Sequence, residues 1–244
     1  MSEAVLKPGT MVLPFGTTSW TAERMRLEPQ PDGGWVHDCP VAYAVAGQGG
    51  HRLSDASHNL PAPAHLEAGD HAGMFAFLKN RAGGLCDIWN NRQAVFIERY
   101  FEFIAAHLEE QVAELDAMAA EYSGLYRPDH WLFSAFAPLP QAHIYAGAAG
   151  AVGADRFVLA PAALWTDTAG IAVYFPGSET VGGKTASDQA SLRGAGIEIL
   201  ELGEDDLASA DAFAAALPDA VKYYWRGQHP PLGPFAPELP EVIS

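Results

Sequence analysis

Residues 160–179, "APAALWTDTAGIAVYFPGSE", contain a short apolar run between turn-forming residues. The apolar residues 171–175 lie between Gly170 and Pro176, and a short apolar run between turn formers predicts a buried strand. Two more runs of this kind, residues 141–145 and 157–160, come earlier in the chain. The sequence therefore predicts three consecutive strands.

The residues that follow, "KTASDQASLRGAGIEILELGEDDL" at 184–207, continue the pattern. Residues 185–195 read as a helix, residues 197–202 as a strand, and the alanine-rich residues 209–217 as a second helix.

Upstream, residues 96–122 place apolar side chains at spacings of three and four, which is typical of one long amphipathic helix. Ser123 and Gly124 are suited to end it. The expected order is helix, three strands, helix, strand, helix.

Three regions follow from composition. Residues 1–95 are rich in turn formers, with strand-like runs at 11–15 and 41–45, and are expected to be loop-rich and strand-bearing, with a long loop over residues 47–73. Residues 96–227 form the predicted core. Residues 228–244 carry five prolines and are expected to be an extended arm lying on this protein or on a neighbour.

The succession of elements over residues 130–217 resembles the restriction-endonuclease-like PD-(D/E)XK superfamily, in particular its small bacterial branch related to very short patch repair endonucleases. The resemblance implies an α/β (α+β) fold with a mixed sheet flanked by helices. It also implies a site at which clustered carboxylates hold Mg²⁺, which polarises the scissile phosphate and activates water.

Carried over residue by residue, the resemblance implies that the site is degenerate. If Gly177 is the glycine after the third-strand motif, the metal-binding Glu position holds Tyr174 and the position two residues further on holds Pro176. The Asp position of the preceding strand holds Pro161. Tyr and Pro cannot bind Mg²⁺, so the resemblance implies lost nuclease chemistry.

Other polar residues near this site leave alternatives open. Asp188 and Arg193 match helix positions that help to orient the site in such proteins, although a surface Asp and Arg are also ordinary solvated residues. An active nuclease with relocated carboxylates would have to use the nearby acids Asp155, Asp167 and Glu179.

The segment Gly183-Lys184-Thr185 ends like a phosphate-binding loop and lies between a strand and a helix. Such a loop needs glycine at position 178, where this chain has Ser178. The mismatch favours a glycine-rich connecting loop over a nucleotide site, and leaves Lys184 with no phosphate assigned to it.

A rival site lies in the expected loop. Imidazole nitrogens and carboxylates can bind Zn²⁺ or Fe²⁺, and a metal-dependent enzyme could use residues 51–71. No established ligand spacing is present. The candidate ligands are His51, His58, His65, His71, Asp55 and Asp70, with Glu67 beside them.

The net charge of the chain disfavours binding to nucleic acid. The 244 residues hold 30 Asp and Glu against 14 Lys and Arg, a formal charge of -16, which repels phosphate backbones. Residues 96–126 and 196–244 are the most acidic parts and suit solvated or partner-binding faces. No secretory signal, membrane span or cysteine framework is evident, so a cytoplasmic protein is expected.

Together these features predict a catalytically inactive, nuclease-like protein. It would act as a binding, scaffold or regulatory subunit through protein–protein contacts, in a hetero- or homo-oligomer. No cofactor, nucleic acid or membrane is expected to take part.

Overall fold

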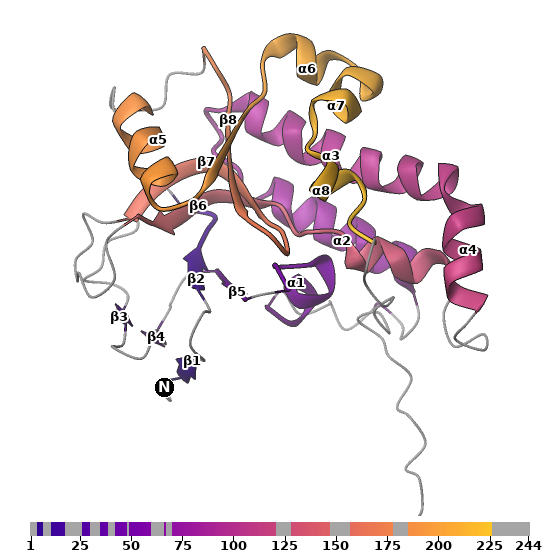
Figure 1. The fold of residues 1–244 in the computed structure, drawn as a ribbon, viewed down its shortest axis with the longest axis horizontal. Coiled ribbons are helices and arrows are strands. Elements are labelled where there is room, and N and C mark those ends of the chain that lie inside the picture. Colours follow the sequence, from indigo (N-terminus) through magenta and orange to yellow (C-terminus); the bar gives the residue numbers. More distant parts are fainter. Residues whose placement is uncertain are drawn as a thin grey trace, which may run out of the picture.

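Figure 1 shows the computed structural model of the chain. It describes residues 4–6, 11–17, 26–29, 35–38, 42–47, 49–59, 66, 70–120, 128–146, 157–177 and 185–225. These residues form a mixed α/β structure in which helices flank a four-stranded sheet, as the α/β class predicted from the sequence requires.

The sheet has the strand order β6-β7-β8-β9. Strands β6 (Leu139–Tyr145), β7 (Phe157–Trp165) and β8 (Gly170–Tyr174) form an antiparallel meander. Helix α5 (Thr185–Gly194) then crosses over, and β9 (Glu198–Glu201) pairs with β8 in parallel. The four predicted strands and the predicted helix 185–195 are confirmed, although β7 runs five residues beyond the predicted end at residue 160.

The sheet is the middle of three layers. In β8, Ile171 and Val173 enter one core cluster, whereas Ala172 and Tyr174 enter the other. This alternation follows from the two-residue period of a strand. The first cluster lies toward α3 and the C-terminal helices and the second lies toward α5, so helices cover both faces (Figure 1).

One irregularity interrupts β6 and β7. Ala160 packs in the cluster beneath α5, but Ala162, two residues on, packs in the opposite cluster, which a regular strand would not allow. The break lies at Pro161, which has no N–H to donate, and at Gln141, whose φ is 49°. The two strands keep their pairing on either side, from Pro140 with Ala162 to residue 142 with residue 160.

The long helix predicted over residues 96–122 is wrong in two respects. Helix α3 (Asn91–Glu110) begins earlier, where the Asn90 side chain accepts a hydrogen bond from the Gln93 backbone N–H. The helix breaks at Gln111, and α4 (Val112–Ala120) follows in a new direction (Figure 1). Because Leu115 is fully buried beyond the break, the apolar spacing continued in the sequence although the helix axis did not. The predicted end at residues 123–124 lies outside the described residues.

Two helices replace part of the predicted loop. Helix α1 (Leu53–Asn59) lies within residues 47–73, and α2 (His71–Gly83) begins where Asp70 caps the Gly73 backbone N–H. The loop prediction is therefore wrong at these residues, and α2 was missed altogether. Leu53 of α1 and Leu78 of α2 are buried in the same cluster as α3.

The N-terminal strands form two smaller sheets. The strand-like runs at 11–15 and 41–45 are confirmed as β2 (Met11–Pro14) and β5 (Tyr43–Ala46), an antiparallel pair. Strands β1 (Ala4–Leu6), β4 (Trp35–Asp38) and β3 (Arg26–Pro29) form a separate sheet in that order.

A 3-10 helix, η2 (Pro128–Ser134), leads into the sheet. After β9 come α6 (Glu204–Ala208), α7 (Ala210–Ala216) and α8 (Asp219–Lys222), and α7 confirms the helix predicted over residues 209–217. Residues 228–244 lie outside the described part, and the division at residues 95 and 227 stays a prediction. Within the described ranges, no helix combines the length and apolar character needed to cross a bilayer.

Candidate functional site

The structure brings the degenerate positions together where β8 ends beside the middle of β7. Ala162 pairs with Val173, so in the same register Pro161 stands opposite Tyr174. Pro176 and Gly177 follow in an exposed turn, in which Gly177 has a φ of 79°. This positive φ is a conformation that glycine adopts without strain.

The start of α3 contacts the backbone at Pro161 and at Pro176. The buried Gln93 donates from its amide nitrogen to the Pro161 carbonyl and accepts through its amide oxygen from the Asp87 backbone N–H at 2.5 Å. Arg92, the preceding residue, donates to the Pro176 carbonyl and lies 3.3 Å from the Glu204 carboxylate of α6. Helix side chains therefore engage the backbone at two of the three positions.

Tyr174 faces the other layer. Its hydroxyl is buried and has no hydrogen-bond partner among the described residues. Burial raises the pKa of Tyr174 to about 12, the nearby Asp188 carboxylate of α5 adds to the rise, and Arg193 opposes it. The position thus holds a neutral phenol at physiological pH, and a neutral phenol does not bind a divalent cation.

The chemistry of the site follows from these side chains. Mg²⁺ is held by carboxylate oxygens in an octahedral arrangement. Among the residues that the structure describes, no three His, Cys, Asp or Glu side chains gather where they could hold a metal ion. Asp188 of α5 is half-buried and lies near Tyr174.

Of the three acids considered as relocated ligands, Asp167 has another role. Both of its carboxylate oxygens accept hydrogen bonds from Arg52, at 2.7 and 2.9 Å, in the turn between β7 and β8. Asp155 and Glu179 lie outside the described residues, as does Lys184 with most of the proposed phosphate-binding loop. Those predictions are untested.

Arg52 is a residue that the sequence reasoning missed. Its side chain, 12% exposed, also donates to the carbonyl oxygens of Gly49 and Ser134 and lies 4.6 Å from the centre of the Phe136 ring. It therefore joins the N-terminal region to η2 and to the sheet. No local sequence signal could have shown this, since Asp167 is 115 residues away.

Gln93 was also missed, although the sequence did carry a signal for it. Four buried residues follow one another along α3 at spacings of three, one and three: Gln93, Phe96, Ile97 and Tyr100. This spacing places Gln93 on the apolar face of the helix. A glutamine on the buried face of a helix must bond to something in the core.

Among the described residues, the candidate metal ligands of residues 51–71 do not gather into a group of three. His51 is buried between the β5 strand and the sheet, where burial lowers its pKa and Asp55 opposes that effect. Asp55 is exposed and accepts a hydrogen bond from the Arg52 backbone N–H at 2.8 Å.

At the other end of this segment, the His71 ring packs 4.7 Å from the ring of His130, and Asp70 caps α2. The side chain of His58, and the whole of His65 and Glu67, fall outside the described residues. The metal hypothesis stays a prediction.

Two exposed apolar side chains lie in the turn just before α3. Residues 87–90 form the turn between α2 and α3, and two large apolar side chains at its centre, Ile88 and Trp89, are 85% and 88% exposed. Arg92, which contacts Pro176, is three residues further on. We call residues 87–90 the apolar turn.

Comparison with known proteins adds no relative. No family model, curated protein or solved structure matches the chain.

Proposed function

We propose that this protein has a restriction-endonuclease-like core without nuclease chemistry and acts as a binding or regulatory subunit. The topology supports the first part: a helix, an antiparallel three-strand meander, a crossover helix and a fourth strand parallel to the third. Fold alone does not fix function, so the second part needs evidence from the site itself.

The proposal rests mainly on the contacts between the start of α3 and the degenerate positions. Gln93 binds the Pro161 carbonyl and Arg92 binds the Pro176 carbonyl. A working site would hold carboxylates around an open cation position, because Mg²⁺ must contact both the protein and the scissile phosphate. In this chain α3 side chains bind the Pro161 and Pro176 carbonyls on one side, and the buried phenol of Tyr174 faces the opposite layer.

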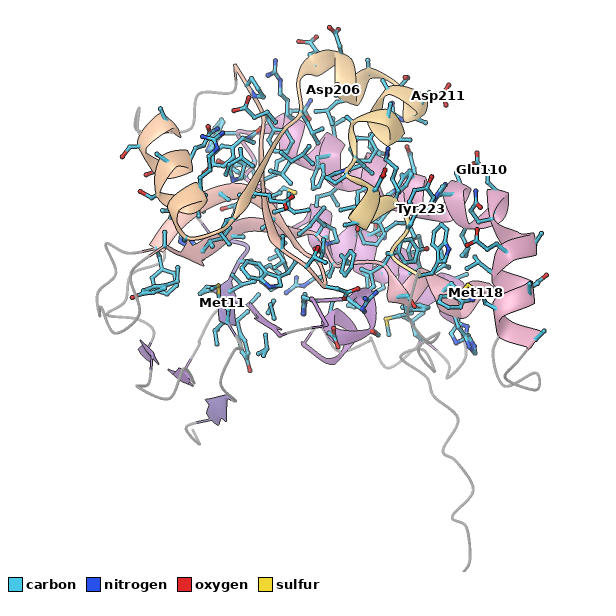
Figure 2. All side chains as sticks on the ribbon, viewed as in Figure 1. Met11, Glu110, Met118, Asp206, Asp211 and Tyr223 are labelled. Carbon is cyan, nitrogen blue, oxygen red and sulfur yellow. The ribbon has the colours of Figure 1, made fainter. Side chains whose placement is uncertain are left out.

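Electrostatics support the same proposal. Acidic side chains cover the outer surface over α6, α7 and the end of α3, where Figure 2 labels Asp206, Asp211 and Glu110. The formal charge of the chain is -16. A surface that cuts nucleic acid needs cations to neutralise phosphates, and a strong negative field opposes that contact.

The apolar turn is the surface that we propose for a protein partner. Exposed large apolar side chains cost solvation, and Trp is enriched among the residues that dominate protein–protein binding. A hydrogen bond also braces the turn, since the Asp87 side chain accepts from the Trp89 backbone N–H at 3.0 Å. A partner that buried Ile88 and Trp89 would lose little conformational entropy here.

The test is recovery of a partner from the native source with the tagged full chain. A stoichiometric partner should co-purify with the wild type and be lost when Ile88 and Trp89 are both changed to Ser, because these side chains are exposed and the change should not disturb folding. Val112, 39% exposed on α4, provides the matched control, and Val112→Ser should keep the partner. A chain that purifies alone as a monomer, or a partner retained by the double variant, would contradict the proposal.

A further inference from the structure

The backbone of the apolar turn is hydrogen-bonded at both ends. The Asp87 backbone N–H donates to Gln93, the Asn90 backbone N–H donates to the Asp87 carbonyl at 3.0 Å, and Asn90 caps α3. Each end of the turn is thus tied to a helix. Ile88 and Trp89 are presented to solvent by an ordered backbone, which favours docking with one partner geometry.

The charge beside the turn differs from that of the whole chain. Residues 79–92 contain Lys79, Arg81 and Arg92 against the single acid Asp87, in a chain whose formal charge is -16. Arg92 is engaged by Pro176 and Glu204. Lys79 and Arg81, in the last turns of α2, pair with no carboxylate in the described ranges. The surface therefore suits an apolar segment that carries acidic residues.

The chain itself contains such a segment. Residues 228–237, "QHPPLGPFAP", have no Asp, Glu, Lys or Arg, and residues 238–244, "ELPEVIS", add Glu238 and Glu241. Proline-rich segments favour the extended polyproline II conformation and dock on exposed aromatic rings at low entropic cost. Phe235 is the one aromatic residue of this segment.

The reach of the segment matches the distance. Trp225, the last described residue, lies at the far end of α3, with its ring 5.2 Å from that of His107. From His107 back to Asn91 the helix rises about 24 Å, and Trp89 is two residues further. Ten residues of polyproline II, from Trp225 to Phe235, span about 31 Å.

The order of residues along the segment also fits. Its uncharged part would pass α3, whose exposed side chains include Glu98 and Glu102, without adding like charge. Glu238 and Glu241 come after Phe235 and would reach the end of α2, where Lys79 and Arg81 lie. Both the spacing and the sign of charge agree with one direction of docking.

We propose that residues 228–244 of the same chain dock on the apolar turn, with Phe235 against Trp89 and the two glutamates beside Lys79 and Arg81. This inference rests on the proposed function, because it assigns a regulator to the same surface. The segment competes with the external partner for Trp89. Partner binding then requires release of the segment, and the affinity of the partner is lowered by the fraction of chains in which the segment is docked.

The test observes Trp89 directly in the full chain. Protein labelled with 5-fluorotryptophan is studied by fluorine NMR, and the Trp89 signal is assigned with Trp89→Phe. Phe235→Ser should shift the Trp89 signal toward that of a solvent-exposed indole. Adding a synthetic peptide of residues 228–244 to the Phe235→Ser protein should restore the wild-type signal, and the same peptide with Phe235→Ser should not. Val242→Ser is the matched control within the segment and should leave the signal unchanged.

Each other outcome overturns the proposal. An unchanged Trp89 signal in Phe235→Ser shows that the segment does not dock there. A wild-type signal that moves toward the exposed position on dilution shows that the segment comes from a second copy. Because no external partner is present in this measurement, its failure is distinguishable from failure of the proposed function.

Discussion

Arg52 and Asp167 form a two-point ion pair across 115 residues of chain, with the guanidinium Nη2 at 2.7 and 2.9 Å from the two carboxylate oxygens. The Arg52 side chain is 12% exposed and that of Asp167 is 30% exposed. Removing one partner of a pair that is largely desolvated leaves the other charge without compensation.

We expect Arg52→Met to lower the free energy of unfolding by about 3 kcal/mol, because it also leaves the Ser134 carbonyl without its donor. Chemical denaturation measures this. Arg99→Met is the control: its partner Glu102 is 42% exposed, and this pair should contribute less than about 0.5 kcal/mol. Equal losses in the two variants would show that the Arg52 pair is not a structural link.

Two buried tyrosines should respond differently to loss of the hydroxyl. The Tyr100 hydroxyl donates to the Phe136 carbonyl at 2.8 Å, whereas the Tyr174 hydroxyl has no partner in the part of the chain that the structure describes. Tyr100→Phe should therefore cost about 1.5 kcal/mol of unfolding free energy, and Tyr174→Phe should be neutral or slightly stabilising. Thermal denaturation of the two variants checks the difference. A large loss in Tyr174→Phe would mean that its hydroxyl is bonded in solution.

The contact between α3 and the middle of β7 depends on Gln93. Gln93→Leu leaves the Pro161 carbonyl and the Asp87 backbone N–H without partners, so we expect a loss of about 2 kcal/mol. Gln189→Leu is the matched control, since that amide bonds to the exposed carboxylate of Glu201 and should cost less than about 1 kcal/mol. A similar small loss in both variants would argue that α3 does not close the site.

Two buried histidines predict weakening in mild acid. Burial lowers the pKa of His51 and of His143 below the ordinary value of 6.5, and the His143 Nε2 lies 2.7 Å from the Thr17 carbonyl. A lowered folded-state pKa means that the unfolded chain binds protons first, so stability is full above pH 6.5 and falls as the pH drops below it.

His143→Gln should reduce this slope by up to about 1.4 kcal/mol per pH unit. Denaturation between pH 7.5 and about 5.5 measures the slope before most carboxylates titrate. If the variant and the wild type weaken equally over this window, His143 is not the responsible group.

Much of the core could be predicted from the sequence. Short apolar runs bounded by Gly170 or Pro176 admit few structures other than buried strands, and β8 lies where the run placed it. The helical spacing of apolar residues did not reveal the break at Gln111, because that spacing continues past the point where the helix changes direction. Helix α2 was missed because Phe75 and Phe77 lie outside its fully buried face and blur the helical period.

The candidate site was less predictable. The positions of Pro161 and Tyr174 came from a resemblance, and the register then placed them opposite each other. Arg92 and Gln93 bind the backbone carbonyls of Pro176 and Pro161, and every residue has such a carbonyl. Such contacts leave no mark in the residue types of their acceptors, so only the tertiary structure shows them.

The most direct test of the central claim is metal-dependent cleavage by the purified full chain. Supercoiled plasmid, single-stranded DNA and RNA are incubated with millimolar Mg²⁺ or Mn²⁺. No cleavage above that of a chelator control is expected, because Pro161, Tyr174 and Pro176 supply no metal ligand. Cleavage that follows the protein through purification and is lost in Asp188→Asn or Glu179→Gln would show that the protein is an active nuclease.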